Sequence, residues 1–479
     1  MRLQFNGPAF WVTLVIVVLL LWFVGRWLLR FPAGALFGIL AAVFTITAVY
    51  IIFRVPPMIK GDAAVVAENA GKFLRGDYAG LEKGHYLDFW PAQLGLVAWD
   101  GLLFRISDSV RILFIANIGF SLINCFLQWQ IAAALFRDEP GQACAAEKLT
   151  ILLSYAFLPL LFFVLFAYGF VPGLCFAQAA FLSLIRFSKA GGVVDAVLCP
   201  VFLSLALFFK PNYLITAIAL GITVMLLFAE TRKKAYPAIL AALILVTVFQ
   251  NAGLYAYYEK VSGMEIRGDV PRTLTMAMSV LPEYGETERP AGWYNGYEYD
   301  AYVSVDYDRE RGAQLGREKL AETMSYWVQN PGKAIRFFGE KWLTTWCDPM
   351  YESVWIGPLV DDGAAHFDPV MESLYAGDYA YLVAEKWMTA LAVLVYGGAA
   401  LFWFPWNRRR FRDAAIPTVS LYTLLFLLGG VMLHLISETK SQYAFPYVYC
   451  LIPYASCSMA NSRLFVKRAE KNGKAGDNS

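Results

Sequence analysis

The chain has 479 residues, of which 58% are hydrophobic and only 16% are charged. Soluble domains contain roughly 45–50% apolar and about 25% charged residues. A mean hydropathy of +0.49 leaves too little polar surface to cover a water-soluble particle of this size. The composition therefore excludes an ordinary soluble protein. The net charge of +2 gives no sign of nucleic-acid binding, and the seven cysteines do not show the spacing of a disulfide framework or a zinc site.

Apolar stretches long enough to cross a hydrocarbon core of roughly 30 Å recur along the chain. They lie near residues 10–29, 32–53, 110–136, 149–168, 172–187, 193–209, 212–229, 236–256, 387–405, 416–436 and 443–460. We therefore expect an all-α polytopic membrane protein with about 11 transmembrane helices. Only tight turns separate the stretches between 149 and 229, so a pair of helices there could be lost or gained without changing the topology.

The positions of lysine and arginine predict how these helices are oriented. Basic residues cluster in alternate loops, which the positive-inside rule assigns to the cytoplasm. The clusters are Arg26/Arg30, Arg137/Lys148, Arg186/Lys189, Arg232/Lys233/Lys234, Arg408/Arg409/Arg410/Arg412 and the tail after Arg463. With eleven crossings, the N-terminus and the two long polar loops, 54–109 and 257–386, then lie outside the cell membrane.

This topology divides the chain into four parts. Residues 1–256 form an N-terminal transmembrane region of about eight helices that includes the first outer loop, residues 54–109. Residues 257–386 form a large extracytoplasmic loop, 387–462 a C-terminal region of about three helices, and 463–479 a basic cytoplasmic tail. Helical spacing predicts a helix over 63–74 and an interfacial helix over 94–106. The large loop is expected to be mainly α-helical, from 317 to 327 and again after Pro331.

Asp62 is the first residue that could carry chemistry. It follows Gly61 just after the second apolar stretch and precedes a predicted helix. An aspartate at such a place is often a helix N-cap. The functional alternative is a carboxylate at the membrane surface that takes a proton from an acceptor hydroxyl. The residues alone leave both interpretations open.

Several short motifs occur together with Asp62. They are Gly76-Asp77-Tyr78, Tyr86-Leu87-Asp88-Phe89-Trp90-Pro91-Ala92-Gln93, Gly292-Trp293-Tyr294-Asn295-Gly296-Tyr297, Trp346-Cys347-Asp348-Pro349 and Glu438-Thr439-Lys440-Ser441-Gln442-Tyr443-Ala444-Phe445-Pro446. This combination resembles the C-superfamily of membrane glycosyltransferases (GT-C). More narrowly, it is similar to the bacterial branch that includes protein O-mannosyltransferases and lipid A aminoarabinose transferase.

The resemblance implies an inverting enzyme that moves a sugar from a polyprenyl-phosphate carrier to an acceptor hydroxyl on the outer face of the membrane. It gives Asp62 the role of general base. Lys210 and Lys440 are the cations expected to hold the lipid phosphate, although lysines at such places also simply reach toward lipid headgroups. Related sequences often have Arg-Tyr where this chain has Gln442-Tyr443, so Lys440 would replace that arginine.

Further residues are candidates for substrate binding. Tyr86, Gln93, Glu438 and Tyr443 belong to the motifs that carry the resemblance. Charges that could shape the acceptor site, or could merely be solvated, are Arg75, Asp77 and Asp88. Residues suited to stacking on a sugar, or to docking on headgroups, are Trp293, Tyr294 and Asn295. His85 reads as a surface group and His434 as a packed residue.

No cofactor is certain from the sequence. Acidic residues leave a divalent cation open, although a solvated acidic face is the simpler interpretation. These residues are Asp306, Asp308, Asp348, Glu352, Asp361, Asp362 and Asp368. No metal ligand is assigned.

The expected partners are the polyprenyl-phosphate sugar, membrane lipids, and a cell-surface glycan, glycolipid or protein acceptor. Two alternatives to the enzyme remain. One is a transporter or flippase of a lipid-linked saccharide, and the other is a non-catalytic accessory relative of such an enzyme.

Overall fold

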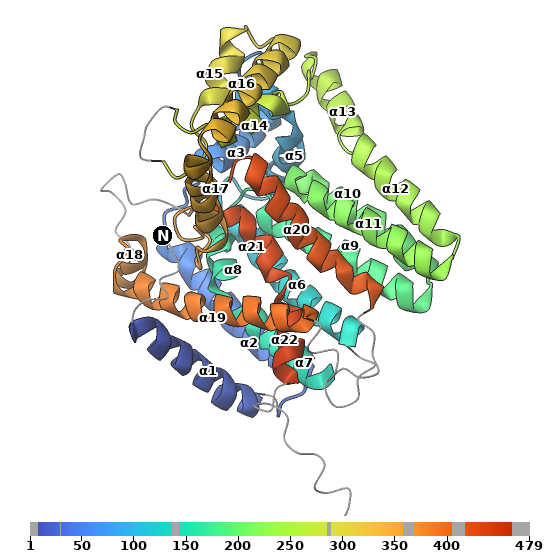
Figure 1. Cartoon of the computed structure of the whole chain (residues 1–479), viewed down its shortest axis with the longest axis vertical. Helices are drawn as coiled ribbons and strands as arrows, with labels where there is room; N and C mark the ends of the chain where they lie inside the picture. The colour runs from blue at the N-terminus through green and yellow to red at the C-terminus, as the bar shows by residue number, and fades with distance from the viewer. Residues whose placement is uncertain are drawn as a thin grey trace, which may run out of the picture.

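The computed structural model describes residues 8–28, 30–136, 143–284, 289–357, 368–404 and 417–461. It is 79% helical, and no strand occurs within these ranges. The apolar helices form one body, and a smaller group of helices, α14, α15 and α16, covers one end of it (Figure 1). The expected all-α fold is confirmed in this form.

Seven helices of the described chain are long and apolar enough to cross a membrane. They are α2 (Ala33–Arg54), α6 (Arg111–Phe136), α9 (Phe170–Ala190), η4 with α11 (Pro211–Thr231), α12 with α13 (Ala235–Ser262), α19 (Tyr379–Trp403) and η6 with α20 (Thr418–Ile436). A bent pair, α7 (Ala143–Ala156) with α8 (Leu158–Phe162) and η3 (Phe163–Leu165), makes an eighth if it counts as one crossing. The apolar helices α1 (Pro8–Leu28) and α10 (Val193–Phe209) do not meet the same test.

Proline explains two departures from continuous helices. Pro159 follows the break at Phe157, where the chain bends by 52° between the helices on either side, because proline cannot donate to the preceding turn. The last apolar stretch is also divided, into α21 (Ser441–Tyr449) and α22 (Ile452–Ala460), with Pro446 and Pro453 near the break. Each has nine residues and spans only about 13 Å. Both are almost entirely buried, so they form core rather than a lipid-facing crossing.

The first loop is more helical than its polarity suggests. It contains α3 (Gly61–Leu74), η1 (Ala79–Leu81), α4 (Tyr86–Phe89), η2 (Pro91–Gln93) and α5 (Leu94–Phe104). The predicted interfacial helix corresponds to α5, but α5 is buried on most sides against α3 and α10. Gly95 permits this packing, because a Cβ there would lie 2.2 Å from the Phe208 carbonyl oxygen.

The second loop is α-helical, as expected. It contains α14 (Arg272–Val280), α15 (Tyr297–Ser304), α16 (Arg309–Gln329), α17 (Pro331–Trp346) and α18 (Pro369–Tyr375). The Asp308 side chain accepts a hydrogen bond from the Arg311 amide at 2.9 Å and starts α16 earlier than predicted. Pro331 occupies the first turn of α17, as its sequence position predicts.

Several contacts bind the two loops to each other, and two of them lie close to Tyr86 and Gln93 in the sequence. Arg267 donates to both oxygens of Asp88 at 2.6 Å, and the Val270 amide donates to the Phe89 carbonyl at 2.9 Å. The Asp88 side chain is only 5% exposed. This partly buried ion pair therefore fixes the second loop against the segment that carries Tyr86 and Gln93.

Candidate functional site

Asp62 lies in the first turn of α3, but it does not cap the helix. The N-cap position belongs to Lys60, and no side-chain cap bond is present. The N-cap interpretation of Asp62 is therefore wrong. Gly61 adopts a φ of +59°, a conformation that glycine tolerates and that turns the chain into the helix. The exposed Asp62 carboxylate accepts a hydrogen bond from the Tyr168 hydroxyl at 3.4 Å.

Tyr168 links Asp62 to Lys210. The Lys210 ammonium lies 3.3 Å from the centroid of the Tyr168 ring, a close cation–π contact. Lys210 is only 4% exposed, and it follows α10 directly in extended backbone. Burial lowers the pKa of Lys210 to about 7, while the nearby carboxylates of Asp62 and Glu438 oppose that shift.

Glycines hold the backbone around Lys210 in place. Gly169 has a φ of +71°, and a Cβ on it would lie 2.0 Å from the Phe209 carbonyl oxygen. A Cβ on Gly173 would meet the Tyr213 ring at 2.4 Å. Only glycine allows such an approach, so these two positions determine where Lys210 sits.

Tyr86 and Gln93, both predicted to bind substrate, converge on the same tyrosine. The Tyr86 and Tyr168 hydroxyls lie 2.8 Å apart, and the Gln93 amide donates to the Tyr168 hydroxyl at 3.1 Å. Burial, together with the charge of Asp62, raises the pKa of Tyr86. The first loop thus contributes Asp62, Tyr86 and Gln93 to one polar cluster.

The late motif, residues 438–446, contributes further charges to the site. Lys440 Nζ lies 3.8 Å from a carboxylate oxygen of Glu438. Burial raises the pKa of Glu438, an effect opposed by Lys440 and Lys210 and increased by Asp62. The Tyr443 side chain also opposes the rise in the pKa of Glu438. Asp62, Lys210 and Lys440, which are far apart in the sequence, are therefore all close enough to Glu438 to act on its pKa.

A small cavity opens beside this cluster. Its lining includes Lys210, Tyr213, His434, Tyr443 and Tyr447. His434 stacks on Tyr443 with 5.5 Å between ring centroids. Its Nδ1 lies 3.2 Å from the Glu438 carbonyl oxygen, so His434 is packed and hydrogen-bonded as expected. His85 is exposed, also as expected.

The second loop contacts the late motif directly. The Thr439 amide donates to the Gly292 carbonyl at 3.0 Å, and the Lys440 ammonium lies 5.7 Å from the Trp293 ring centroid. Burial and surrounding carboxylates raise the pKa of Tyr294 to about 12. Trp293 and Tyr294 therefore border the site.

Asn295 has a local role. Its side-chain amide donates to the Met278 carbonyl at 3.1 Å, and its side-chain oxygen accepts from the Tyr297 amide at 3.1 Å. Both bonds are of the kind that asparagine makes in turns. Asn295 therefore shapes the turn that presents Trp293 and Tyr294.

Two charged residues near the site were not singled out from the sequence. Glu298 is 3% exposed, its Oε2 has no hydrogen-bond partner in the described chain, and burial raises its pKa to about 7, with smaller contributions from Glu438 and Asp62. Lys341 on α17 is 1% exposed and donates to the Ser279 carbonyl at 2.9 Å. Burial lowers the pKa of Lys341 to about 7, opposed by Glu438.

Three predicted residues lie elsewhere. Arg75 and Asp77 are exposed at the far end of α3 from Asp62, about 20 Å away at 1.5 Å per helical residue. The Asp77 carboxylate accepts from the Ala79 amide at 3.1 Å. Asp88 is engaged by Arg267 and by the Gly84 amide at 2.9 Å. Their proposed contact with substrate stays a prediction.

Within the described ranges, no group of three or more His, Cys, Asp or Glu residues is placed to hold a metal ion. Asp348 and Glu352 instead accept from the Ser441 hydroxyl at 2.6 and 3.1 Å. Asp306 pairs with Lys83 at 2.7 Å. Asp361 and Asp362 lie outside the described residues. These contacts give Asp348 and Glu352 a structural role, because they fix the residue next to Lys440.

No protein-family model matches the chain, and no curated protein matches it significantly. In its described ranges, the protein is all-helical and has seven or eight helices long and apolar enough to cross a membrane.

Proposed function

We propose that this protein is an inverting glycosyltransferase that uses a polyprenyl-phosphate sugar. The observation that carries the proposal is the meeting of Asp62, Lys210 and the Glu438–Lys440 pair, which come from three distant segments. The family resemblance of the motifs supports it further. The proposal includes the finer topology, with about eleven crossings and both long loops on the outer face, where carrier-linked sugars are available.

In the proposed reaction, the exposed Asp62 carboxylate takes the proton from an acceptor hydroxyl. That oxygen attacks the anomeric carbon of the donor sugar, and the bond from this carbon to the phosphate oxygen breaks. The phosphate monoester leaves with the bonding electrons, and Lys210 and Lys440 neutralise its charge. One base and one displacement invert the anomeric centre, so no second carboxylate nucleophile is needed.

The cation–π contact suits Lys210 to this role. An anion that arrives within a few ångströms favours the charged form of a buried lysine. Lys210, whose pKa burial lowers to about 7, would therefore hold its proton more firmly with the phosphate bound than without it. Trp293 and Tyr294 supply aromatic faces beside Lys440 on which a sugar ring can stack.

The test is transfer of labelled sugar from a polyprenyl-phosphate carrier by the purified protein in proteoliposomes. Asp62→Asn removes the base at nearly constant shape, and we expect transfer to fall by about 10²-fold or more. Glu68→Gln is the matched control, since Glu68 is an exposed carboxylate on the same helix that pairs with Lys72. Unchanged transfer by Asp62→Asn would refute the assignment of the base.

One observation favours a flippase as the second candidate. Transporters often contain broken helices, and the α7–α8 pair is bent by 52°. The same proteoliposomes separate the candidates, because a flippase moves the labelled donor across the bilayer without consuming it. A non-catalytic accessory relative would neither move nor consume the donor.

A further inference from the structure

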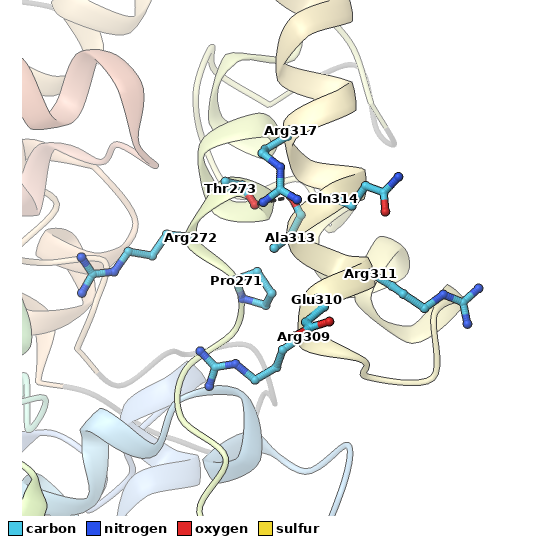
Figure 2. A pocket seen from close by; sticks show the side chains of 9 residues that line it. All are labelled: Pro271, Arg272, Thr273, Arg309, Glu310, Arg311, Ala313, Gln314 and Arg317. Atoms are coloured by element: carbon cyan, nitrogen blue, oxygen red, sulfur yellow. Dashed lines mark hydrogen bonds between the residues drawn. The ribbon is translucent and has the colours of Figure 1, made fainter.

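An arginine-rich cleft lies between the start of α14 and the first half of α16 (Figure 2). Its charged lining consists of four arginines, Arg272, Arg309, Arg311 and Arg317, and one acidic residue, Glu310. All four arginines are exposed, and none forms an ion pair within 4 Å in the part of the chain that the structure describes. The lining therefore carries a net positive charge, which Glu310 and the nearby Asp269 offset in part. Arg272 and Arg311 point to opposite sides of the cleft (Figure 2).

Specific contacts hold the walls of the cleft together. The Thr273 hydroxyl donates to the Ala313 carbonyl at 3.0 Å and joins its two walls. A Cβ on Gly316 would lie 2.7 Å from the Leu274 amide nitrogen, so the two helices approach closely there. Arg309 donates to the Arg267 carbonyl, which ties the cleft to the residue that pairs with Asp88.

Helix α14 runs from this cleft to the candidate site. Arg272 stands at its first residue and lines the cleft. Near its other end, the Ser279 hydroxyl donates to the Ile436 carbonyl at 2.9 Å, two residues before Glu438, and the Ser279 carbonyl accepts from Lys341. The nine residues of α14 cover about 13 Å. A ligand that reaches both places must be an extended chain.

We propose that the cleft binds a linear acceptor polymer that carries repeated anionic groups, and that it holds this polymer while one unit lies at Asp62. The proposal rests on the proposed glycosyltransferase function. Guanidinium groups pair with phosphate and carboxylate in a two-pronged geometry, and exposed arginines without ion-pair partners are suited to this. A short neutral acceptor would gain nothing from the cleft, whereas a polyanion would be bound at a distance from the reacting hydroxyl.

Binding is tested on the purified full chain with two fluorescent probes, short-chain inorganic polyphosphate and oligogalacturonate, followed by anisotropy at constant salt. The double variant Arg311→Gln/Arg317→Gln removes two cleft charges. The control, Arg105→Gln/Arg336→Gln, removes two exposed arginines that do not line the cleft. We expect the cleft variant to weaken binding at least about tenfold and the control to change it less than twofold. Preference for one probe identifies phosphate or carboxylate as the repeated anion.

Any one of three outcomes overturns the inference. Both double variants weaken probe binding equally, or neither probe binds to the wild-type protein, or the cleft variant loses only the binding to vesicles of anionic lipid. Asp62→Asn keeps this test apart from that of the proposed function, because it should abolish transfer and leave probe binding intact. If wild-type protein transfers sugar but binds neither probe, the cleft proposal alone fails. If it binds the probes and transfers no sugar, the proposed function is wrong, and the cleft then has no role in holding an acceptor.

Discussion

Replacing Lys210 by methionine should make the protein more stable while it abolishes transfer. Lys210 is 4% exposed, and burial lowers its pKa from 10.5 to about 7. One pKa unit corresponds to about 1.4 kcal/mol, so burying this lysine opposes folding by at most about 5 kcal/mol at neutral pH. The cation–π contact with Tyr168 stabilises the folded state by about 2 kcal/mol, and the methionine variant loses it. The attraction of Asp62 and Glu438 is already contained in the lowered pKa, so an expected gain of up to about 3 kcal/mol remains.

The sign of the pH dependence follows from the direction of the shift. The folded state holds the proton of Lys210 less tightly than the unfolded chain does. The opposition to folding is therefore complete below about pH 7, and it fades as the pH rises from about 7 toward 10.5. The advantage of Lys210→Met over wild type should be largest at and below neutral pH and should shrink in alkaline buffer.

A thiol-reactive fluorophore can measure this stability. Cys125, Cys175, Cys199, Cys450 and Cys457 are buried and become reactive only when the helices separate. Lys260→Met serves as the control, because Lys260 is exposed on α13 and should leave the unfolding temperature unchanged. A Lys210→Met variant that is no more stable than wild type would refute the cost assigned to this lysine. One that is stable and still transfers sugar would refute its role in phosphate binding.

Two further predictions concern residues around the site. Glu298→Gln should raise the unfolding temperature above about pH 7 and have little effect near pH 4.5. The reason is that the pKa of Glu298 is raised in the folded state, so ionisation of this group opposes folding as the pH increases. A gain in unfolding temperature that stays constant across about pH 5–8 would contradict this. Gly169→Ala should destabilise the protein by about 3 kcal/mol or more, since a Cβ there meets the Phe209 carbonyl at a positive φ. The control Gly253→Ala faces open space, and equal thermal unfolding of the two variants would contradict the packing argument.

Apolar periodicity and turn residues predicted four helices of the polar loops, α3, α5, α16 and α17, but not α4, α14, α15 or α18. The spacing over 63–74 corresponds to α3, and Pro331 opens α17. The final apolar stretch was treated as one helix because hydropathy averaged over 443–460 does not register a break. The break comes just before Pro453, whose ring clashes with the carbonyl four residues earlier. The two short helices on either side are buried by neighbouring helices. That burial is a tertiary property, which apolar composition alone does not distinguish from contact with lipid.

The site was predictable only where its residues fall in recognisable motifs. Asp62 and Lys440 were found in this way. Tyr168, Glu298 and Lys341 were not, because each has partners more than twenty residues away and an ordinary local sequence. Lys341 belongs to a helix with a mixed polar and apolar pattern, in which a lysine normally faces water. The local signs of tight turns here were the segment from Gly169 to Gly173 and the run Lys210-Pro211-Asn212.

The charges of the site bear on the phosphate binding that the proposed function requires. Glu438 lies among Lys210, Lys341 and Lys440, and it acts on the pKa of the first two. A buried lysine without a neighbouring carboxylate would release its proton at neutral pH. A lipid phosphate that entered here would compete with Glu438 for the same cations, and its negative charge would raise the already elevated pKa of Glu438 further. Binding of the phosphate would thus favour the protonated form of Glu438. The lysines would exchange one anionic partner for another, and the buried charge of the site would change little.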